Sequence, residues 1–222
     1  MKKYAGIALC SFLLGFTAAT QPFIEEIRQF RKADSLQAPP QHPILFVGSS
    51  SFTNWKDVQD YFPGRTILNR AFGGSSLTHL IQYADEVIFQ YKPKQIVIYC
   101  GENDLAGNDQ VTADTVFARF SLLLSMIHEK LPGTSIIYLS MKPSPSRRKY
   151  LPAIQEGNKK IKNLLSQFPL AQFLDIYSVM LTANGAIRSD IFLADSLHMN
   201  KKGYALWKPL LEPLLHHGSV KK

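Results

Sequence analysis

Three consecutive serines, Ser49 to Ser51, follow an unbroken apolar run over residues 44–47 and the turn-forming Gly48. A short apolar run ended by turn residues is typical of a strand buried on both faces of a parallel sheet. In open α/β sheets, ligands bind beyond the carboxyl ends of the strands. A serine hydroxyl held there could act as a nucleophile. Serine is also a common turn and N-cap residue, and from this stretch alone that structural explanation is the stronger one.

The groups that would make such a serine reactive lie elsewhere in the chain. Acyl transfer needs a general base, a group that orients the base, and donors that stabilise the oxyanion. Asp195 and His198 are three residues apart, so in a helical turn the carboxylate would lie beside the imidazole. Gly74, the second residue of a glycine pair, could offer an unobstructed backbone N–H, and Asn103 a side-chain amide. Each feature alone has an ordinary explanation as a turn, a cap or an exposed pair; their order and placement together favour catalysis.

The elements that must position these residues alternate along the chain. We predict strands at five short apolar segments: Ile44 to Val47, Thr66 to Asn69, Gln95 to Cys100, Ser135 to Met141 and Phe173 to Tyr177. Apolar residues at helical spacing predict helices over Pro22 to Phe30, Leu77 to Tyr91, Thr112 to Leu131, Lys149 to Phe168 and Gly203 to His217. This alternation is typical of an α/β fold with a doubly wound parallel sheet. In such a sheet the candidate groups would lie on one rim.

Length and composition fit one globular domain. A chain of 222 residues is long enough for one well-buried α/β domain and short for two. The hydrophobic content is 45% and the charged content 19%, which are ordinary values. The net charge of +8 is spread over short basic pairs and triplets, two of its lysines being Lys2 and Lys3. Because no basic stripe is interleaved with aromatic residues, we expect no nucleic-acid partner. No stable partner protein is implied either.

No motif for a nucleotide or a metal accompanies these residues. The glycine pair at 73–74 lacks the G-x-G-x-x-G pattern, and residues 48–51 lack the Gly-Lys-Ser/Thr of a phosphate loop. No cluster of cysteines and histidines has zinc spacing. We therefore expect no metal and no organic cofactor. Cys100 is the single cysteine outside the first 20 residues, and we expect it to be a small buried apolar residue.

The first 20 residues have the order of an export signal. Lys2 and Lys3 precede an apolar region from Ala5 to Phe16, and small residues at 17–19 are compatible with cleavage after Ala19. The apolar run is shorter than the roughly 20 residues that a spanning helix needs, although an uncleaved anchor through residues 4–20 is an alternative. We therefore expect an exported protein, periplasmic or secreted, whose folded domain comprises residues 21–222.

Taken in order, the motifs resemble those of the SGNH hydrolases, also called the GDSL lipase/esterase family. The resemblance covers nearly all of the chain after the leader. It rests on Val47-Gly48-Ser49-Ser50, Asn69 to Ser75, Gly101-Glu102-Asn103-Asp104 and Asp195-Ser196-Leu197-His198. It implies Ser50 as nucleophile, His198 as general base and Asp195 as the group that orients the base. It also implies an oxyanion hole made of the Ser50 N–H, the Gly74 N–H and the Asn103 amide. The implied fold is a flavodoxin-like three-layer α/β/α sandwich with a central parallel five-stranded sheet.

The chain departs from the family pattern at one position. Ser49 stands where the usual Gly-Asp-Ser has its aspartate, as in a subgroup with a Gly-Ser-Ser-Ser turn, and the segment Met141 to Pro145 also resembles that subgroup. That position is thought to be structural, so the departure does not exclude activity. The residue pattern alone does not separate the three serines. The family register selects Ser50, two residues after Gly48, and we expect Ser51 to help start the following turn.

The resemblance implies a serine esterase that hydrolyses carboxylic esters through an acyl-serine intermediate. Acetyl or other short acyl groups on a small molecule, a carbohydrate, a cell-wall polymer or a lipid are compatible substrates. A thioesterase or lysophospholipase is an alternative within the same chemistry. A non-catalytic ligand-binding module on the same fold is an alternative from another class, as is a flavodoxin-like binder of phosphate or nucleotide.

Overall fold

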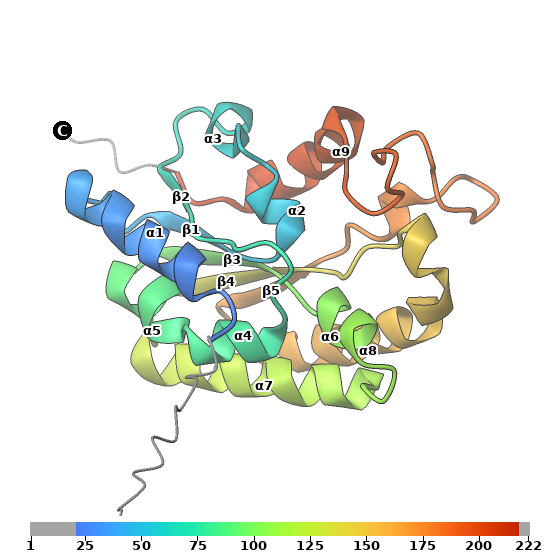
Figure 1. Ribbon diagram of the computed structural model, residues 1–222, viewed down its shortest axis with the longest axis horizontal. Coiled ribbons are helices and arrows are strands. Elements are labelled where there is room, and N and C mark those ends of the chain that lie inside the picture. Colours follow the sequence, from blue (N-terminus) through green and yellow to red (C-terminus); the bar gives the residue numbers. More distant parts are fainter. Residues whose placement is uncertain (1–20, 218–222) are drawn as a thin grey trace, which may run out of the picture.

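A five-stranded sheet, parallel throughout, forms the centre of the protein (Figure 1). The computed structural model describes residues 21–217. The strands lie in the spatial order β2-β1-β3-β4-β5, and each neighbouring pair is parallel. Their bounds are β1 (Ile44–Gly48), β2 (Ile67–Asn69), β3 (Gln95–Tyr99), β4 (Ser135–Leu139) and β5 (Ala171–Leu174). The predicted α/β fold with a central parallel sheet of five strands is confirmed.

Helices cover both faces of the sheet, which gives three layers (Figure 1). One face is covered by α1 (Ile24–Leu36), α4 (Leu77–Gln82), α5 (Ala84–Val87), α7 (Ala113–Lys130) and α8 (Leu151–Leu165). The other face is covered by α2 (Ser50–Thr53), α3 (Val58–Tyr61) and α9 (Lys201–Leu211). The short helix α6 (Glu102–Gly107) follows β3 at the carboxyl edge of the sheet. Four short 3₁₀ helices complete the described part: η1 (Phe89–Tyr91), η2 (Pro145–Tyr150), η3 (Ser178–Met180) and η4 (Glu212–Leu214).

The core consists of two clusters, one on each face of the sheet. Leu45 and Val47 of β1 pack into the first cluster, whereas Ile44 and Phe46 pack into the second. Because both faces are buried, β1 has no polar alternation, and this is why the sequence shows an unbroken apolar run there. The second cluster is rich in aromatic side chains, among them Trp207 against Phe52 and Tyr99. It supports the start of α2, where the serines lie.

The predicted helix over Leu77 to Tyr91 is broken into three pieces, α4, α5 and η1. Two residues interrupt it, because Tyr83 and Ile88 leave helical backbone geometry. The Tyr83 hydroxyl donates to Pro22 O at 2.6 Å, and its ring packs against Phe72. We attribute the break at Tyr83 to these tertiary contacts, which local helix propensity does not reveal.

Other element boundaries differ from the prediction by a few residues. The strand predicted over Phe173 to Tyr177 is β5, which ends at Leu174. It ends there because Asp175 Oδ1 accepts the backbone N–H groups of Tyr177 and Ser178, which forms a turn. The last helix begins before the predicted Gly203, since Asn200 caps it by accepting from the N–H groups of Lys202 and Gly203. Helix α1 continues to Leu36, beyond the predicted end at Phe30.

The predicted leader, residues 1–20, lies outside the described residues. Over residues 21–217, the helices are all too short or too polar to cross a membrane. Cys100 is buried in the first core cluster and forms no disulfide, as expected for a small apolar residue.

Candidate active site

Ser50 begins α2 directly after β1, at the carboxyl edge of the sheet. The turn between the two elements depends on Gly48, whose φ is +138°. A Cβ added at Gly48 would lie 1.9 Å from the backbone oxygen of Tyr99, so only glycine fits beside β3 here. The Ser49 N–H donates to the same Tyr99 oxygen at 3.0 Å. The turn is therefore held against β3, and the start of α2 has a fixed position.

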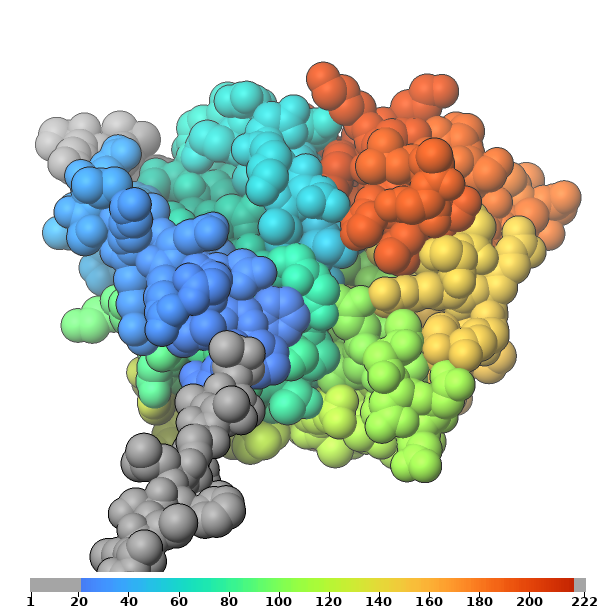
Figure 2. Space-filling model, viewed as in Figure 1, coloured from blue at the N-terminus to red at the C-terminus, as the bar shows by residue number. Residues whose placement is uncertain are grey.

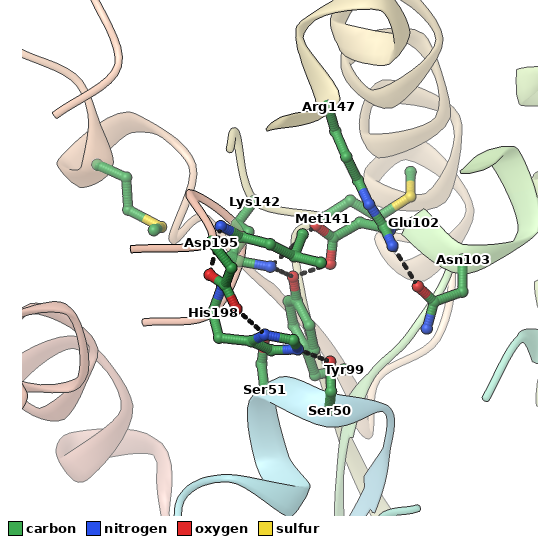
Figure 3. Close-up of polar contacts among 12 residues, drawn as sticks. Ser50, Ser51, Tyr99, Glu102, Asn103, Met141, Lys142, Arg147, Asp195 and His198 are labelled. Carbon is green, nitrogen blue, oxygen red and sulfur yellow. Dashed lines mark hydrogen bonds and ion pairs between the residues drawn. The ribbon is translucent and has the colours of Figure 1, made fainter. Parts of the chain in front are cut away.

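Of the three adjacent serines, Ser50 is the one whose hydroxyl contacts the histidine. Its Oγ lies 3.0 Å from His198 Nε2 (Figure 3). Ser49 and Ser51 are buried, and the Ser51 hydroxyl makes no hydrogen bond within the described part of the chain. The N-cap residue of α2 is Ser49, without a side-chain capping bond. Ser51 is the second residue of the four-residue helix α2 and does not cap it.

Asp195 and His198 lie in an irregular turn before α9, and the predicted helical turn is wrong. Ser196, between them, has a positive φ of +56°. Asp195 Oδ1 accepts the backbone N–H groups of Leu197 and His198, both at 2.9 Å. The carboxylate thus closes its own turn. This turn still brings the two side chains together, because Asp195 Oδ2 lies 2.6 Å from His198 Nδ1.

These contacts determine how the histidine can act. An ionised carboxylate can only accept a hydrogen bond, so Nδ1 of His198 carries a proton toward Asp195. In the neutral ring, Nε2 is then free to accept the Ser50 hydroxyl proton. The pKa of Asp195 is lowered to about 2, chiefly by the hydrogen bond with the His198 side chain and then by backbone N–H donors. The arrangement can therefore move a proton from the serine to the imidazole beside a fixed negative charge.

The loop after β2 brings Gly74 to the same place. Phe72 N–H and the Ser75 hydroxyl both donate to Gly48 O at 3.0 Å, which fixes this loop against the end of β1. A Cβ added at Gly73 would lie 4.0 Å from the Cβ of Ser50. Gly74 has a φ of +84°. In the described residues, neither the Gly74 N–H nor the Ser50 N–H donates to another backbone group.

Asn103, in the first turn of α6, lies beside this loop. Its Nδ2 donates one amide hydrogen to Ser75 O at 2.9 Å. The second hydrogen of the amide is not used in this bond. Its Oδ1 accepts from Arg147 Nη2 at 2.6 Å. Figure 3 shows His198 and Asn103 on opposite sides of Ser50. The structure therefore brings together all five residues that the motifs singled out: Ser50, Gly74, Asn103, Asp195 and His198.

The segment after β4 contributes contacts that the sequence did not reveal. Lys142, which is buried, donates to Glu102 Oε1 at 3.1 Å and to the Tyr99 hydroxyl at 3.2 Å, and Tyr99 donates to Glu102 (Figure 3). Burial lowers the pKa of Lys142, although the Glu102 carboxylate beside it acts in the opposite direction. Arg147 reaches Asn103 from η2. The sequence singled out Met141 to Pro145 without assigning it contacts, and no local pattern pairs residues about 40 positions apart.

A shallow groove of about 360 Å³ adjoins the proposed oxyanion donors. Gly74 and Asn103 line it together with Ser76, His79, Asn108 and Arg119, among others. A separate, mostly apolar cavity of about 180 Å³ lies near the amino ends of β4 and β5, away from Ser50. In the space-filling view, the segments after β3 and β4 and the C-terminal segment lie against one another on this face (Figure 2). Segments distant in sequence thus meet on one face of the molecule.

The described residues offer no group of three or more histidine, cysteine or carboxylate side chains that could hold a metal ion. The histidine of the site is instead bound on both ring nitrogens, by Asp195 and by Ser50.

Residues 34–206 match the sequence profile of the GDSL-like lipase/acylhydrolase family, which is most of the chain. A comparison with curated proteins gives no significant match. Solved structures share the fold at low identity. A GDSL-like lipase from Bacteroides thetaiotaomicron is 20% identical with a TM-score of 0.72, and the match covers 85% of this chain and 96% of that one.

Two further structures have the same fold. The lipase/acylhydrolase from Enterococcus faecalis is 20% identical with a TM-score of 0.61, over 80% of this chain and 100% of that one. A catalytic mutant of an acetylxylan esterase from Geobacillus stearothermophilus is 13% identical with a TM-score of 0.63, over 82% of this chain and 97% of that one.

Proposed function

Because the chain belongs to the GDSL-like lipase/acylhydrolase family, we propose that it hydrolyses carboxylic esters through an acyl intermediate on Ser50. The observation that carries the proposal is the continuous hydrogen-bonded row from Ser50 Oγ through His198 to Asp195. A nucleophile, a base within hydrogen-bond reach and a group that orients the base are the arrangement that covalent acyl transfer requires.

In the first half of the reaction, Ser50 Oγ forms a bond to the ester carbonyl carbon while its proton moves to His198 Nε2. The carbonyl oxygen becomes an oxyanion. As the tetrahedral intermediate collapses, the bond from carbon to the alcohol oxygen breaks, and His198 returns the proton to that oxygen. The alcohol leaves, and the acyl group stays on Ser50. Asp195 remains ionised throughout, since its pKa is about 2, and it stabilises the imidazolium.

In the second half, water takes the place of the alcohol. His198 Nε2 accepts a proton from the water as its oxygen attacks the acyl carbon, and it then returns that proton to Ser50 Oγ as the acyl–serine bond breaks. The products are a carboxylic acid and the free enzyme. No further reactant is needed to balance either half.

The oxyanion in this proposal is stabilised by the N–H groups of Ser50 and Gly74 and by the Asn103 amide. The first two have no backbone acceptor among the described residues, and Asn103 has one amide hydrogen left over. Donors that are already oriented act strongly on charge that develops in the transition state, and losing one typically costs about 10²–10³-fold in kcat.

We propose acetyl or other short acyl esters as substrates. The support is the closeness of the loop after β2 to Ser50, where a Cβ added at Gly73 would lie 4.0 Å from the Ser50 Cβ. Carbohydrates, small molecules and lipids remain the candidate alcohols, with thioesters and lysophospholipids as the alternative. The order of residues 1–20 supports export to the periplasm or beyond the cell as part of this proposal.

The test is turnover of p-nitrophenyl acetate by the full chain, its Ser50→Ala variant and a Ser51→Ala control. Ser51 is the matched control because its hydroxyl is adjacent and makes no hydrogen bond among residues 21–217. We expect turnover by the wild type and by Ser51→Ala, and none above background by Ser50→Ala. If a correctly folded wild type turns over neither this ester nor longer acyl esters, the fold serves ligand binding and the proposal fails.

A further inference from the structure

The segment from Lys142 to Arg147 connects the two loops on either side of Ser50. Lys142 binds Glu102 in the loop after β3, at 3.1 Å. Arg147 binds the next residue, Asn103, at 2.6 Å. The Ser146 N–H donates to Ser196 O at 3.1 Å, inside the turn that presents His198. One segment after β4 therefore fixes both the proposed oxyanion donor and the turn of the proposed base.

The Arg147 contact determines which atom of the Asn103 amide faces which neighbour. A guanidinium can only donate, so the amide atom beside it is the oxygen. The amide nitrogen must then lie on the other side, and there it donates to Ser75 O at 2.9 Å, next to Gly74. Ser75 O can only accept, so both neighbours require the same orientation. Without Arg147, only the Ser75 contact would hold the amide.

Arg147 also polarises the amide that it holds. A hydrogen bond from a charged donor to Oδ1 draws electron density toward that oxygen and leaves the N–H groups more positive. Within residues 21–217, no carboxylate forms an ion pair with Arg147, whereas Lys142 is paired with Glu102. The guanidinium is partly buried, so solvent screens it less than an exposed one.

We propose that Arg147 is a positioning residue for ester hydrolysis: it holds and polarises the Asn103 amide so that the remaining N–H stabilises the oxyanion. The inference rests on the proposed function of Ser50 and adds a residue that the motifs do not contain. It assigns to the segment after β4 the role of setting the oxyanion donor. Because Arg147 acts through Asn103, removing it should matter only while Asn103 is present.

A double-mutant cycle on kcat for p-nitrophenyl acetate tests this dependence. The single variants are Arg147→Met, which keeps the aliphatic stem and removes the donors, and Asn103→Ala. We expect Asn103→Ala to lower kcat by roughly 10²–10³-fold and Arg147→Met by roughly 10- to 100-fold, the range for a hydrogen bond to a charged group. The double variant should be no slower than Asn103→Ala alone. KM should change little in either single variant.

Arg148→Met is the matched control, since this neighbouring arginine is exposed. It should retain the wild-type kcat. Thermal unfolding of each variant separates a folding defect from a catalytic one. If Arg147→Met does not fold, the same cycle with Arg147→Ala, which also lacks the donors, decides the matter by the same criterion.

Two results would overturn the inference. If Arg147→Met lowers kcat by the same factor with and without Asn103, Arg147 does not act through that amide. If it raises KM and leaves kcat unchanged, Arg147 binds substrate directly. Neither result touches Ser50, whereas full turnover in Ser50→Ala would remove the proposed function itself. Non-additive kcat values together with an inactive Ser50→Ala support both proposals.

Discussion

At the scale of single residues, the ionised state of Asp195 sets the expected pH dependence. Its pKa is about 2, because the His198 side chain and backbone N–H groups bind the carboxylate. The carboxylate thus stays ionised above about pH 3. Activity that is lost on acidification before that pH is reached must therefore be lost through another group. A histidine acts as a base only when its imidazole is neutral. We expect kcat/KM for p-nitrophenyl acetate to fall as the pH is lowered and imidazole is protonated.

The variant that tests the role of this carboxylate is Asp195→Asn. An asparagine amide would favour the wrong tautomer of the imidazole, so we expect kcat to fall by about 10⁴-fold, as in other triads. Unfolding should occur at nearly the same temperature, since the turn can keep the oxygen that accepts the backbone N–H groups. A kcat/KM that does not fall as the pH is lowered, or an Asp195→Asn variant with wild-type kcat, would mean that this pair is not the base system.

The sequence was informative at residues whose motif is short and local. Gly48 to Ser50, and Asp195 with His198, are each separated by only a few positions, and the structure brings these groups together. The helical turn expected at Asp195 was wrong, because the carboxylate binds the backbone of its own turn. Arg147 could not be found this way. Its partner Asn103 is 44 positions away, and a lone arginine in a loop has no pattern that predicts such a contact.

At the scale of elements, the turn from β1 to α2 is the critical junction. Gly48 has a φ of +138°, and an added Cβ would lie 1.9 Å from Tyr99 O in β3. We expect Gly48→Ala to reduce the free energy of unfolding by about 3 kcal/mol or more, because both backbone strain and a clash with a strand oppose it. Gly64→Ala is the control. Gly64 also has a positive φ, of +76°, but an added Cβ would meet no atom within 4 Å.

Gly64→Ala should reduce the free energy of unfolding by only about 1–2 kcal/mol, from backbone strain alone. Urea unfolding of the two variants gives both values. Equal losses would show that contact with β3 does not determine the need for glycine at position 48.

The strands themselves were predictable because both faces of β1 and β3 are buried and leave no polar interruption. The break in the helix over Leu77 to Tyr91 was not predictable, because Tyr83 is held by Pro22, which is 61 positions away.

At the scale of the whole molecule, the described chain begins beside the site. The Phe23 ring packs against Phe72 and His79, at centroid distances of 5.2 and 4.7 Å. It also lies 3.8 Å from where a Cβ on Gly74 would stand. We therefore predict that residues 21–222 form a soluble, active domain without the leader. Removing Phe23 as well, in residues 24–222, should lower both the thermal midpoint and kcat.

Sedimentation and p-nitrophenyl acetate turnover of the two truncated chains check this prediction. If residues 21–222 are insoluble or inactive while the full chain works in membranes, the leader is an integral part and the export proposal needs revision. Equal stability and activity of the two truncations would show that Phe23 does not support the Gly74 loop. The composition gave the size and class of the domain, but the contact between its first residues and Gly74 depends on tertiary packing alone.

The most direct test of the proposed nucleophile is to find which residue becomes covalently modified. The full chain is treated with a fluorophosphonate, which reacts with activated serines, and the modified peptide is sequenced by tandem mass spectrometry with fragments that separate positions 49, 50 and 51. We predict the label on Ser50, because its Oγ is the one 3.0 Å from His198 Nε2, and no label in His198→Ala. The assignment of Ser50 is contradicted if the label is found on Ser49, on Ser51 or on a serine elsewhere. It is also contradicted if the protein hydrolyses esters but takes up no label.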